Sequence, residues 1–180
     1  MAIYHLVMTI RVGIYPKKNI KKFDHVQLLW NDPYICITLT FLLLECDSGW
    51  MYFEHTGKCY KSFERQQTRE DAIKGCMSAN PSASLVSITD MKTNDFVLSK
   101  VSWRSWIGLE KRNGAWVWPD GTRDSLRNWI PGQPSGDGSF TEIVKDAWTG
   151  KSGQWNDLGS TWRGQTILRG SVCQYDLKGK

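Results

Sequence analysis

The sequence predicts an α+β domain, and three observations support this fold class. Two helix patterns follow one another between residues 68 and 101, and mainly short strand patterns come after them. Such a separation of helices from strands is typical of α+β domains. Four cysteines after residue 45 form an even set, which indicates that disulfide bonds staple the domain. The span 46–176 is long enough for one domain with its own core.

Both helices have a recognisable start. Residues 68–71 (TRED) form a capping signal with acidic residues in the first turn, where the helix dipole favours negative charge. Asn80 and Pro81 end this helix. The second helix begins at residues 89–90, and a compact apolar face follows, made of Phe96, Val97 and Val101.

The strand patterns are short and separated by turn residues. Residues 83–88 alternate apolar and polar side chains between the two helices. Residues 106–109 and 116–118 flank an Asn-Gly turn at 113–114, which is a strong hairpin signal. Further strands are expected at residues 140–144, 154–156 and 171–175. Residues 129–139 are rich in proline and glycine, and a long structured loop of this kind often carries the function.

The cysteines indicate an oxidising compartment. Cys36 lies in an apolar run, and four cysteines remain, which allow three pairings. Pairing of Cys46 with Cys59 would staple an N-terminal hairpin. Cys76 would then pair with Cys173 and close a loop of almost a hundred residues. The alternative is four reduced, buried thiols in a cytosolic protein.

Residues 1–45 are predicted to be an N-terminal leader. Residues 34–44 (YICITLTFLLL) are uncharged and mostly apolar, which suits the core of a signal peptide, whereas a membrane-spanning helix needs roughly 20 residues. Four lysines between residues 17 and 22 match the basic region of such a peptide, although it would be unusually long. A wrongly assigned start and a short membrane anchor are the alternatives. We therefore expect a secreted protein, or else a membrane-anchored one with an extracellular domain, with a short tail at 177–180.

Charge and histidine content argue against several function classes. The net charge of +5 is spread along the chain without a long run of like charges, so nucleic acid is not an expected partner. His55 is the only histidine after Cys46, and no Ser-His-Asp, Cys-His, zinc or phosphate-loop pattern is present. We therefore expect no enzymatic activity. The ten tryptophans suit a loop-rich fold in which most of these rings are buried.

A WND motif at residues 155–157 lies downstream of a WIGL motif at 106–109 and sixteen residues before the last cysteine. Together with the spacing of the four cysteines, this layout resembles a long-form C-type lectin domain across residues 46–175. The resemblance implies two helices packed on small antiparallel sheets, a long irregular loop, and two disulfide bonds, Cys46–Cys59 and Cys76–Cys173.

In the C-type lectin family, a calcium ion and a sugar meet on the long loop. A Glu-Pro-Asn or Gln-Pro-Asp triplet, a further acid and the Asn-Asp of the WND motif supply oxygen ligands. Here the triplet is QPS at 133–135 and Gly138 stands near the position of the further acid, so the calcium site is degenerate. The resemblance implies metal ligands at Gln133, Asp137, Asn156 and Asp157. The alternatives are a polar turn at 133–135 and, at 155–157, a core tryptophan followed by two residues that hold the long loop.

The resemblance also points to ligand contacts beside Gln133, Asn156 and Asp157. Ser135 completes the triplet, Glu142 lies on the following strand, and Trp148 lies in a turn where its ring could stack on a sugar. A solvated strand position is the favoured alternative for Glu142, and filler beneath the loop is an equal alternative for Trp148. Phe140 and Ser160 replace the cysteines of a further family disulfide, and we expect Phe140 to pack into the vacated space.

The expected function is extracellular carbohydrate binding by a lectin domain with a degenerate calcium site, so calcium is a candidate cofactor. The alternative is a lectin-like domain that binds a protein or lipid partner without metal, since one fold hosts both functions. A carbohydrate or glycoconjugate is the expected partner, a protein is the second, and a membrane is expected only if the leader is an uncleaved anchor. The effect of EDTA on ligand binding or melting separates the two hypotheses.

Overall fold

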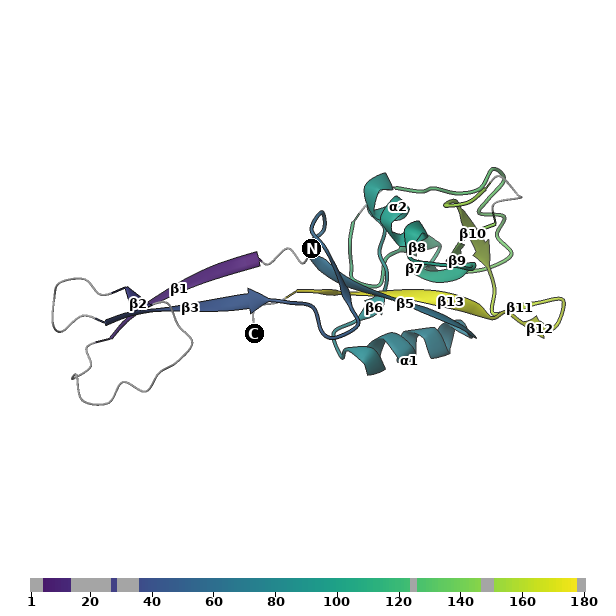
Figure 1. Ribbon diagram of the computed structural model, residues 1–180. Helices are drawn as coiled ribbons and strands as arrows, with labels where there is room; N and C mark the ends of the chain where they lie inside the picture. Colours follow the sequence, from purple (N-terminus) through teal and green to yellow (C-terminus); the bar gives the residue numbers. More distant parts are fainter. Residues whose placement is uncertain (1–4, 14–26, 29–35, 124–125, 147–150, 178–180) are drawn as a thin grey trace. The chain divides into compact units, whose positions relative to one another are not determined.

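The computed structural model describes residues 5–13, 27–28, 36–123, 126–146 and 151–177. It divides into two units, one of residues 46–176 and one of residues 1–45 and 177–180 (Figure 1). The smaller unit is an antiparallel sheet with the strand order β1-β3-β2. Its strands are β1 (His5–Gly13), β2 (Gln27–Leu28) and β3 (Cys36–Leu44).

The apolar run expected to form the core of a signal peptide lies mostly in β3, which pairs with β1 over its full length. Among the described residues, no helix is long and apolar enough to span a bilayer. The role of residues 1–45 as a leader stays a prediction.

The larger unit is the α+β domain that the sequence predicts, with two helices and mostly short strands. Its first half contains β4 (Met51–Phe53), β5 (Lys58–Gln67), α1 (Arg69–Ala79), β6 (Ser84–Leu85), α2 (Met91–Ser99), β7 (Ser105–Arg112) and β8 (Ala115–Val117). Its second half contains β9 (Phe140–Ile143), β10 (Trp155–Leu158), β11 (Thr161–Trp162), β12 (Gln165–Thr166) and β13 (Arg169–Asp176).

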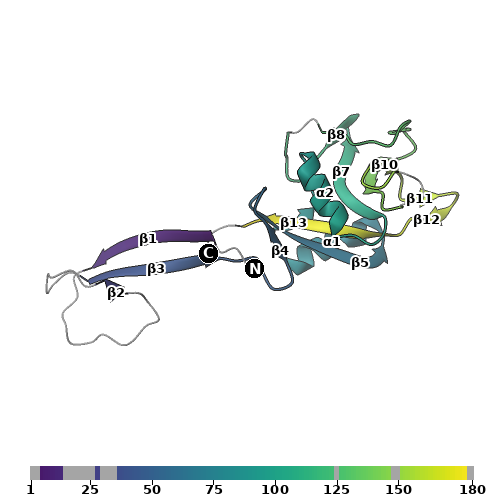
Figure 2. The same ribbon diagram turned by 45° about the horizontal axis from the view of Figure 1, so that its top comes forward.

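One eight-stranded sheet runs through the domain in the order β10-β9-β7-β13-β5-β4, with β6 on β13 and β8 on β7. All of its pairings are antiparallel except that between β7 and β13. Figures 1 and 2 show α1 and α2 on opposite sides of the β5–β13 pair. The β9–β10 pair lies at one end of this sheet, where it carries the long loop.

The helix boundaries follow from their caps, as predicted. The Thr68 hydroxyl accepts a hydrogen bond from the Asp71 amide at 3.1 Å, which satisfies one of the free donors at the start of α1. The Asp90 carboxylate accepts from the Thr93 amide at 2.8 Å and caps α2 in the same way. Asn80 ends α1 in an extended conformation.

The core lies between α2 and the sheet and is rich in aromatic rings. Phe53 and Phe96 stack at 4.0 Å between ring centroids, and Tyr60 meets Phe96 edge-on. Trp155 is fully buried, and the rings of Trp118 and Trp129 pack against it edge-on. Most of the described domain tryptophans are thus buried or half-buried, as expected, and only Trp103 and Trp162 are exposed.

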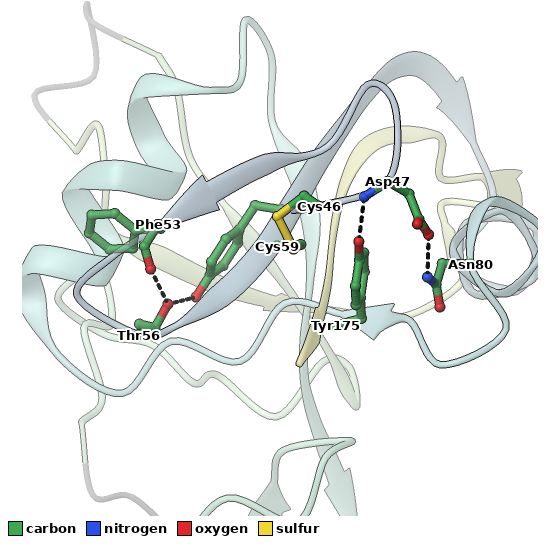
Figure 3. The surroundings of a disulfide bond; sticks show 8 residues. Cys46, Asp47, Phe53, Thr56, Cys59, Asn80 and Tyr175 are labelled. Atoms are coloured by element: carbon green, nitrogen blue, oxygen red, sulfur yellow. Dashed lines mark hydrogen bonds between the residues drawn. A yellow bond between two sulfur atoms is a disulfide. The ribbon is translucent and has the colours of Figure 1, made fainter. Parts of the chain in front are cut away.

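Both disulfide bonds have the pairing that the resemblance implies, Cys46–Cys59 and Cys76–Cys173. Cys46–Cys59 joins the start of the domain to the β4–β5 hairpin (Figure 3). Beside this bond the Tyr175 hydroxyl accepts from the Asp47 amide at 2.7 Å, and Asn80 donates to the Asp47 carboxylate at 2.7 Å. The N-terminal end of the domain is therefore fixed to both β13 and the end of α1.

Two features of the fold go beyond what the sequence predicts. An N-terminal hairpin is expected near Cys46 and Cys59, but the ten-residue length of its second strand, β5, is not. The polar side chains of β5 (KCYKSFERQQ) hide the alternation that would reveal a long strand. The β11–β12 hairpin consists of two-residue strands around Arg163 and Gly164, whose φ angles are 49° and 77°.

Phe140, expected to fill the space of a missing disulfide, is half-buried with its ring 4.4 Å from the Arg69 guanidinium carbon.

Asp120 joins distant segments through its carboxylate. One oxygen accepts from Lys58 on β5 at 3.0 Å and from Gln174 on β13 at 2.8 Å. The other accepts from the Ser87 hydroxyl at 2.8 Å and the Thr122 amide at 3.1 Å. Burial alone would raise the pKa of Asp120, but the hydrogen bonds outweigh it and lower the pKa from 3.8 to about 2.

We expect Asp120 to contribute to stability in a pH-dependent way. Because its pKa is lower in the folded state than in the unfolded state, this stabilisation is complete above pH 3.8 and is lost as the pH falls towards 2. In urea titrations, Asp120→Asn should lower the free energy of unfolding at pH 6 and leave a smaller difference from wild type near pH 2. The exposed Asp95→Asn is the control, and a wild-type-like pH profile for Asp120→Asn would contradict this role.

Candidate functional site

The long loop is held to the core by the backbone of Trp155. The Trp155 amide donates to the Asn128 carbonyl at 2.7 Å, and its carbonyl accepts from the Ile130 amide at 2.9 Å. Its indole nitrogen donates to the Asn94 side chain on α2 at 2.8 Å. One residue thus fixes α2, the entry to the loop and the β9–β10 pair. This agrees with the interpretation of Trp155 as a core residue.

Within the loop, Gln133 and Ser135 bond to each other. The peptide bond between Gln133 and Pro134 is cis, and the Gln133 side-chain oxygen accepts from the Ser135 amide at 2.7 Å. Gln133 is half-buried and Ser135 is exposed. The amide oxygen that would face a cation therefore already accepts a hydrogen bond from the loop itself.

The Asp157 carboxylate holds the long loop through hydrogen bonds from two loop amides. It is 0% exposed, and its two oxygens accept from the amides of Ser135 at 2.8 Å and Gly136 at 2.9 Å. The Ser135 hydroxyl approaches the same carboxylate at 3.4 Å. This arrangement matches the alternative in which Asp157 fixes the long loop. A buried carboxylate with two backbone donors is stabilised without a metal ion.

Asp137 and Gly138 do not restore the missing acidic ligand. Asp137 is exposed, and among the described residues no group of three or more His, Cys, Asp or Glu side chains could hold a metal ion. A Cβ atom at Gly138 would collide with the backbone carbonyl of Leu158, so no side chain fits there without a shift of the backbone. The donor set at this position therefore does not fit a calcium ion, which needs several oxygen ligands and negative charge.

Asn156 turns away from the loop and towards Glu142. The two residues are cross-strand partners on β10 and β9, and the Asn156 amide donates to the Glu142 carboxylate at 3.2 Å. Successive strand residues point to opposite faces, so Asn156 and its neighbour Asp157 serve different partners. Asn156 therefore differs from the alternative in which it holds the loop backbone, because its side-chain amide donates to a strand side chain.

Glu142 is not the solvated strand residue that was favoured from the sequence, because its side chain is 0% exposed. One of its oxygens accepts from Arg104 at 3.0 Å, and the other accepts from Arg169. A buried carboxylate of this kind requires charged partners. Arg104 also bonds Asp146, and this hydrogen bond raises the pKa of Arg104 above its ordinary value. Sequence reasoning missed both arginines.

A cavity of about 390 Å³ opens beside Glu142, between β10, the β11–β12 hairpin and the start of β13. Its polar lining includes Asp137, Asn156, Asp157, Gln165, Thr166 and Arg169. Trp162 also lines it and is 59% exposed. The sequence-predicted residues Glu142, Asn156, Asp157 and Asp137 thus meet at one cavity, whereas Gln133 and Ser135 are not among its lining residues. Trp148 lies outside the described residues.

Removal of the Asp157 carboxylate should loosen the long loop. Asp157→Ala removes the acceptor of the Gly136 amide and one of the two acceptors of the Ser135 amide, which keeps its bond to Gln133. Loss of an acceptor costs about 1–3 kcal/mol for a buried group. We expect a fall of that order in the free energy of unfolding and faster amide exchange at both positions. Asp137→Ala, an exposed change in the same loop, should leave both unchanged. Equal effects of the two variants would contradict the assigned role.

Glu142→Gln should destabilise the domain because it leaves two guanidinium groups without their shared carboxylate. Breaking a fully buried ion pair costs about 3–5 kcal/mol. Arg104 and Arg169 are partly exposed, so solvent screening reduces the expected loss to about 2 kcal/mol. Urea titration measures this loss, and the exposed Glu54→Gln serves as control. A loss below about 0.5 kcal/mol, ordinary for a surface substitution, would show that the cluster contributes little.

Comparison with known proteins connects this geometry to a family. The family model described as Lectin C-type domain matches residues 65–174. The chain is similar to the C-type lectin lectoxin-Lio3 of Erythrolamprus poecilogyrus, with 33% identity over 74% of this chain and 83% of that protein. It is also similar to the hepatic lectin of Gallus gallus, with 35% identity over 67% of this chain, and spans only 59% of that protein.

A solved structure agrees with these relatives. The cow C-type carbohydrate-recognition domain of CD23, crystallised in the presence of a GlcNAc2Man3 oligosaccharide, superposes with a TM-score of 0.60 and 29% identity. The superposition covers 74% of this chain and 98% of that domain. The matched family model, the relatives, the α+β fold and the two disulfide bonds lead to one conclusion: the chain belongs to the C-type lectin domain family.

Proposed function

We propose that the domain is an extracellular carbohydrate-recognition module that binds its ligand without calcium. The observation that carries this proposal is that the Asp157 carboxylate is buried and accepts hydrogen bonds from two amides of the long loop. In a calcium-dependent lectin this position would supply negative charge to the ion. Here the loop amides use that carboxylate, and Gly138 leaves no room for a further acid.

Carbohydrate is the ligand class that the relatives favour. One relative is named a hepatic lectin, and the solved cow domain is named a carbohydrate-recognition domain and was crystallised with an oligosaccharide. The cavity beside Asn156 and Gln165 offers amide and hydroxyl groups to a ligand rich in hydroxyls. Secretion or surface display is consistent with the two disulfide bonds, which persist in oxidising compartments.

The test compares thermal melting and glycan binding of the full, oxidised chain in millimolar calcium and in EDTA. A ligand that binds only the folded state at a hundred times its dissociation constant would add about 2.7 kcal/mol and raise the melting temperature visibly. We expect no shift with calcium, and equal binding to a glycan array in both buffers. A clear upward shift with calcium would overturn the metal-independent part of the proposal.

A second binding assay separates the ligand classes. If a glycoprotein that the chain captures is deglycosylated enzymatically and binding is lost, a carbohydrate ligand is supported. Binding that survives deglycosylation would instead identify a protein partner, which is the alternative expected from the sequence.

A further inference from the structure

We propose that the cavity under the β11–β12 hairpin is the sugar-binding pocket, and that Trp162 stacks on the apolar face of an uncharged pyranose there. This inference rests on the proposed carbohydrate function, and it moves the binding site from the tip of the long loop to the hairpin. Its evidence is the exposure of Trp162, the free polar groups of the lining and the charge balance of the cavity.

Trp162 presents a large apolar ring at the surface. It remains 59% exposed although burial of such a ring is strongly favourable. The Arg163 guanidinium lies 4.4 Å from the ring centroid, a cation–π contact that covers one face of the indole. Trp162 also lines the cavity, so exposed aromatic surface lies where a ligand would bind.

The polar lining beside Trp162 has unused hydrogen-bonding groups. Gln165 is exposed, and among the described residues its side-chain amide has no hydrogen-bond partner. Asn156 donates to Glu142, while its oxygen has no donor within the described part of the chain. Arg169 donates through Nε and Nη1, which leaves Nη2 without an acceptor in the same residues. These donors and acceptors suit the vicinal hydroxyls of a sugar ring.

Glu142 is fully buried and positions two side chains that line the cavity. Its buried carboxylate fixes Arg169 and Asn156 at the floor of the cavity, where both line the surface open to a ligand. Side chains that buried partners already hold in place lose less conformational entropy when they bind a ligand. Glu142 is therefore a positioning residue, and the arginine and asparagine are the ligand contacts.

The charge of the cavity points to an uncharged sugar. Two arginines line it, Arg104 and Arg169, and both already pair with carboxylates. Three carboxylates line it as well, those of Asp137, Glu142 and Asp157. Among the lining residues that the structure describes, a sulfated or sialylated sugar would meet one exposed acid, Asp137, and no arginine without a carboxylate partner. Arg163, which covers the Trp162 ring, is not one of these lining residues. The volume of about 390 Å³ lies within the range of roughly 300–1,000 Å³ that is usual for small-ligand sites.

The experiment measures binding of the full chain to three albumin neoglycoproteins in EDTA by surface plasmon resonance. They carry mannose, galactose or N-acetylglucosamine, and a fourth albumin carries 3-sulfated galactose. We expect at least one uncharged probe to bind, and Trp162→Ala to weaken this binding at least tenfold. Gln165→Ala should weaken it about threefold. Trp103→Ala, which removes an equally exposed tryptophan that does not line the cavity, should leave it unchanged.

Each outcome has a distinct meaning. Binding by wild type that Trp162→Ala leaves intact overturns the pocket assignment but not the proposed carbohydrate function. Failure of folded wild type to bind any of the probes or any sugar of the glycan array overturns both. Stronger binding to the sulfated than to the unsulfated galactose overturns the assignment to an uncharged sugar. Thermal melts control for folding, and all three substituted side chains are exposed, so we expect unchanged melting temperatures.

Discussion

The burial of Trp155 is the constraint on which the end of the domain that carries the long loop and the cavity depends. Its ring fills the centre of the core against Trp118 and Trp129, while its backbone holds both residues that open the long loop. Its indole nitrogen reaches α2 through Asn94. The residues that follow it along β10, Asn156 and Asp157, are thereby placed at the cavity and under the loop. A shift of this one side chain would disturb the core and the site together.

Local signals predicted much of the fold. The two caps predicted the starts of both helices, because Thr68 and Asp90 act within three residues of their own position. The Asn-Gly turn predicted the β7–β8 hairpin, in which Asn113 and Gly114 have positive φ angles. The full length of strand β5 was missed because its pairing with β13 depends on residues about a hundred positions away.

The candidate site was less accessible to sequence reasoning for the same physical reason. Glu142 is buried because Arg104 and Arg169 neutralise it, and these partners are 38 and 27 residues away along the chain. A carboxylate on a strand next to a surface loop is ordinarily solvated, so the sequence favours a solvent-exposed side chain for Glu142. The family resemblance drew attention to the long loop and to Trp148, whereas the aromatic ring at the cavity is Trp162 in a hairpin of two-residue strands. The sequence signal that could have pointed to Trp162 is a tryptophan next to a turn.

Positive charge at this end of the sheet is supplied by the chain itself. Arginine side chains compensate Glu142, and backbone amides compensate Asp157, so neither carboxylate depends on a dissolved ion. The geometry of the cavity should then be the same in calcium-poor and calcium-rich fluids.

The contact between Gly138 and Leu158 limits which side chains this end of the domain can accept. Because the two backbones touch, any side chain at Gly138 meets the Leu158 carbonyl before it can reach a ligand position. A single substitution therefore cannot place an acidic side chain there, since the loop must first move away from β10. An engineer who wished to build a calcium site at this position would have to redesign the backbone around Gly138, because a change of side chain alone would not fit.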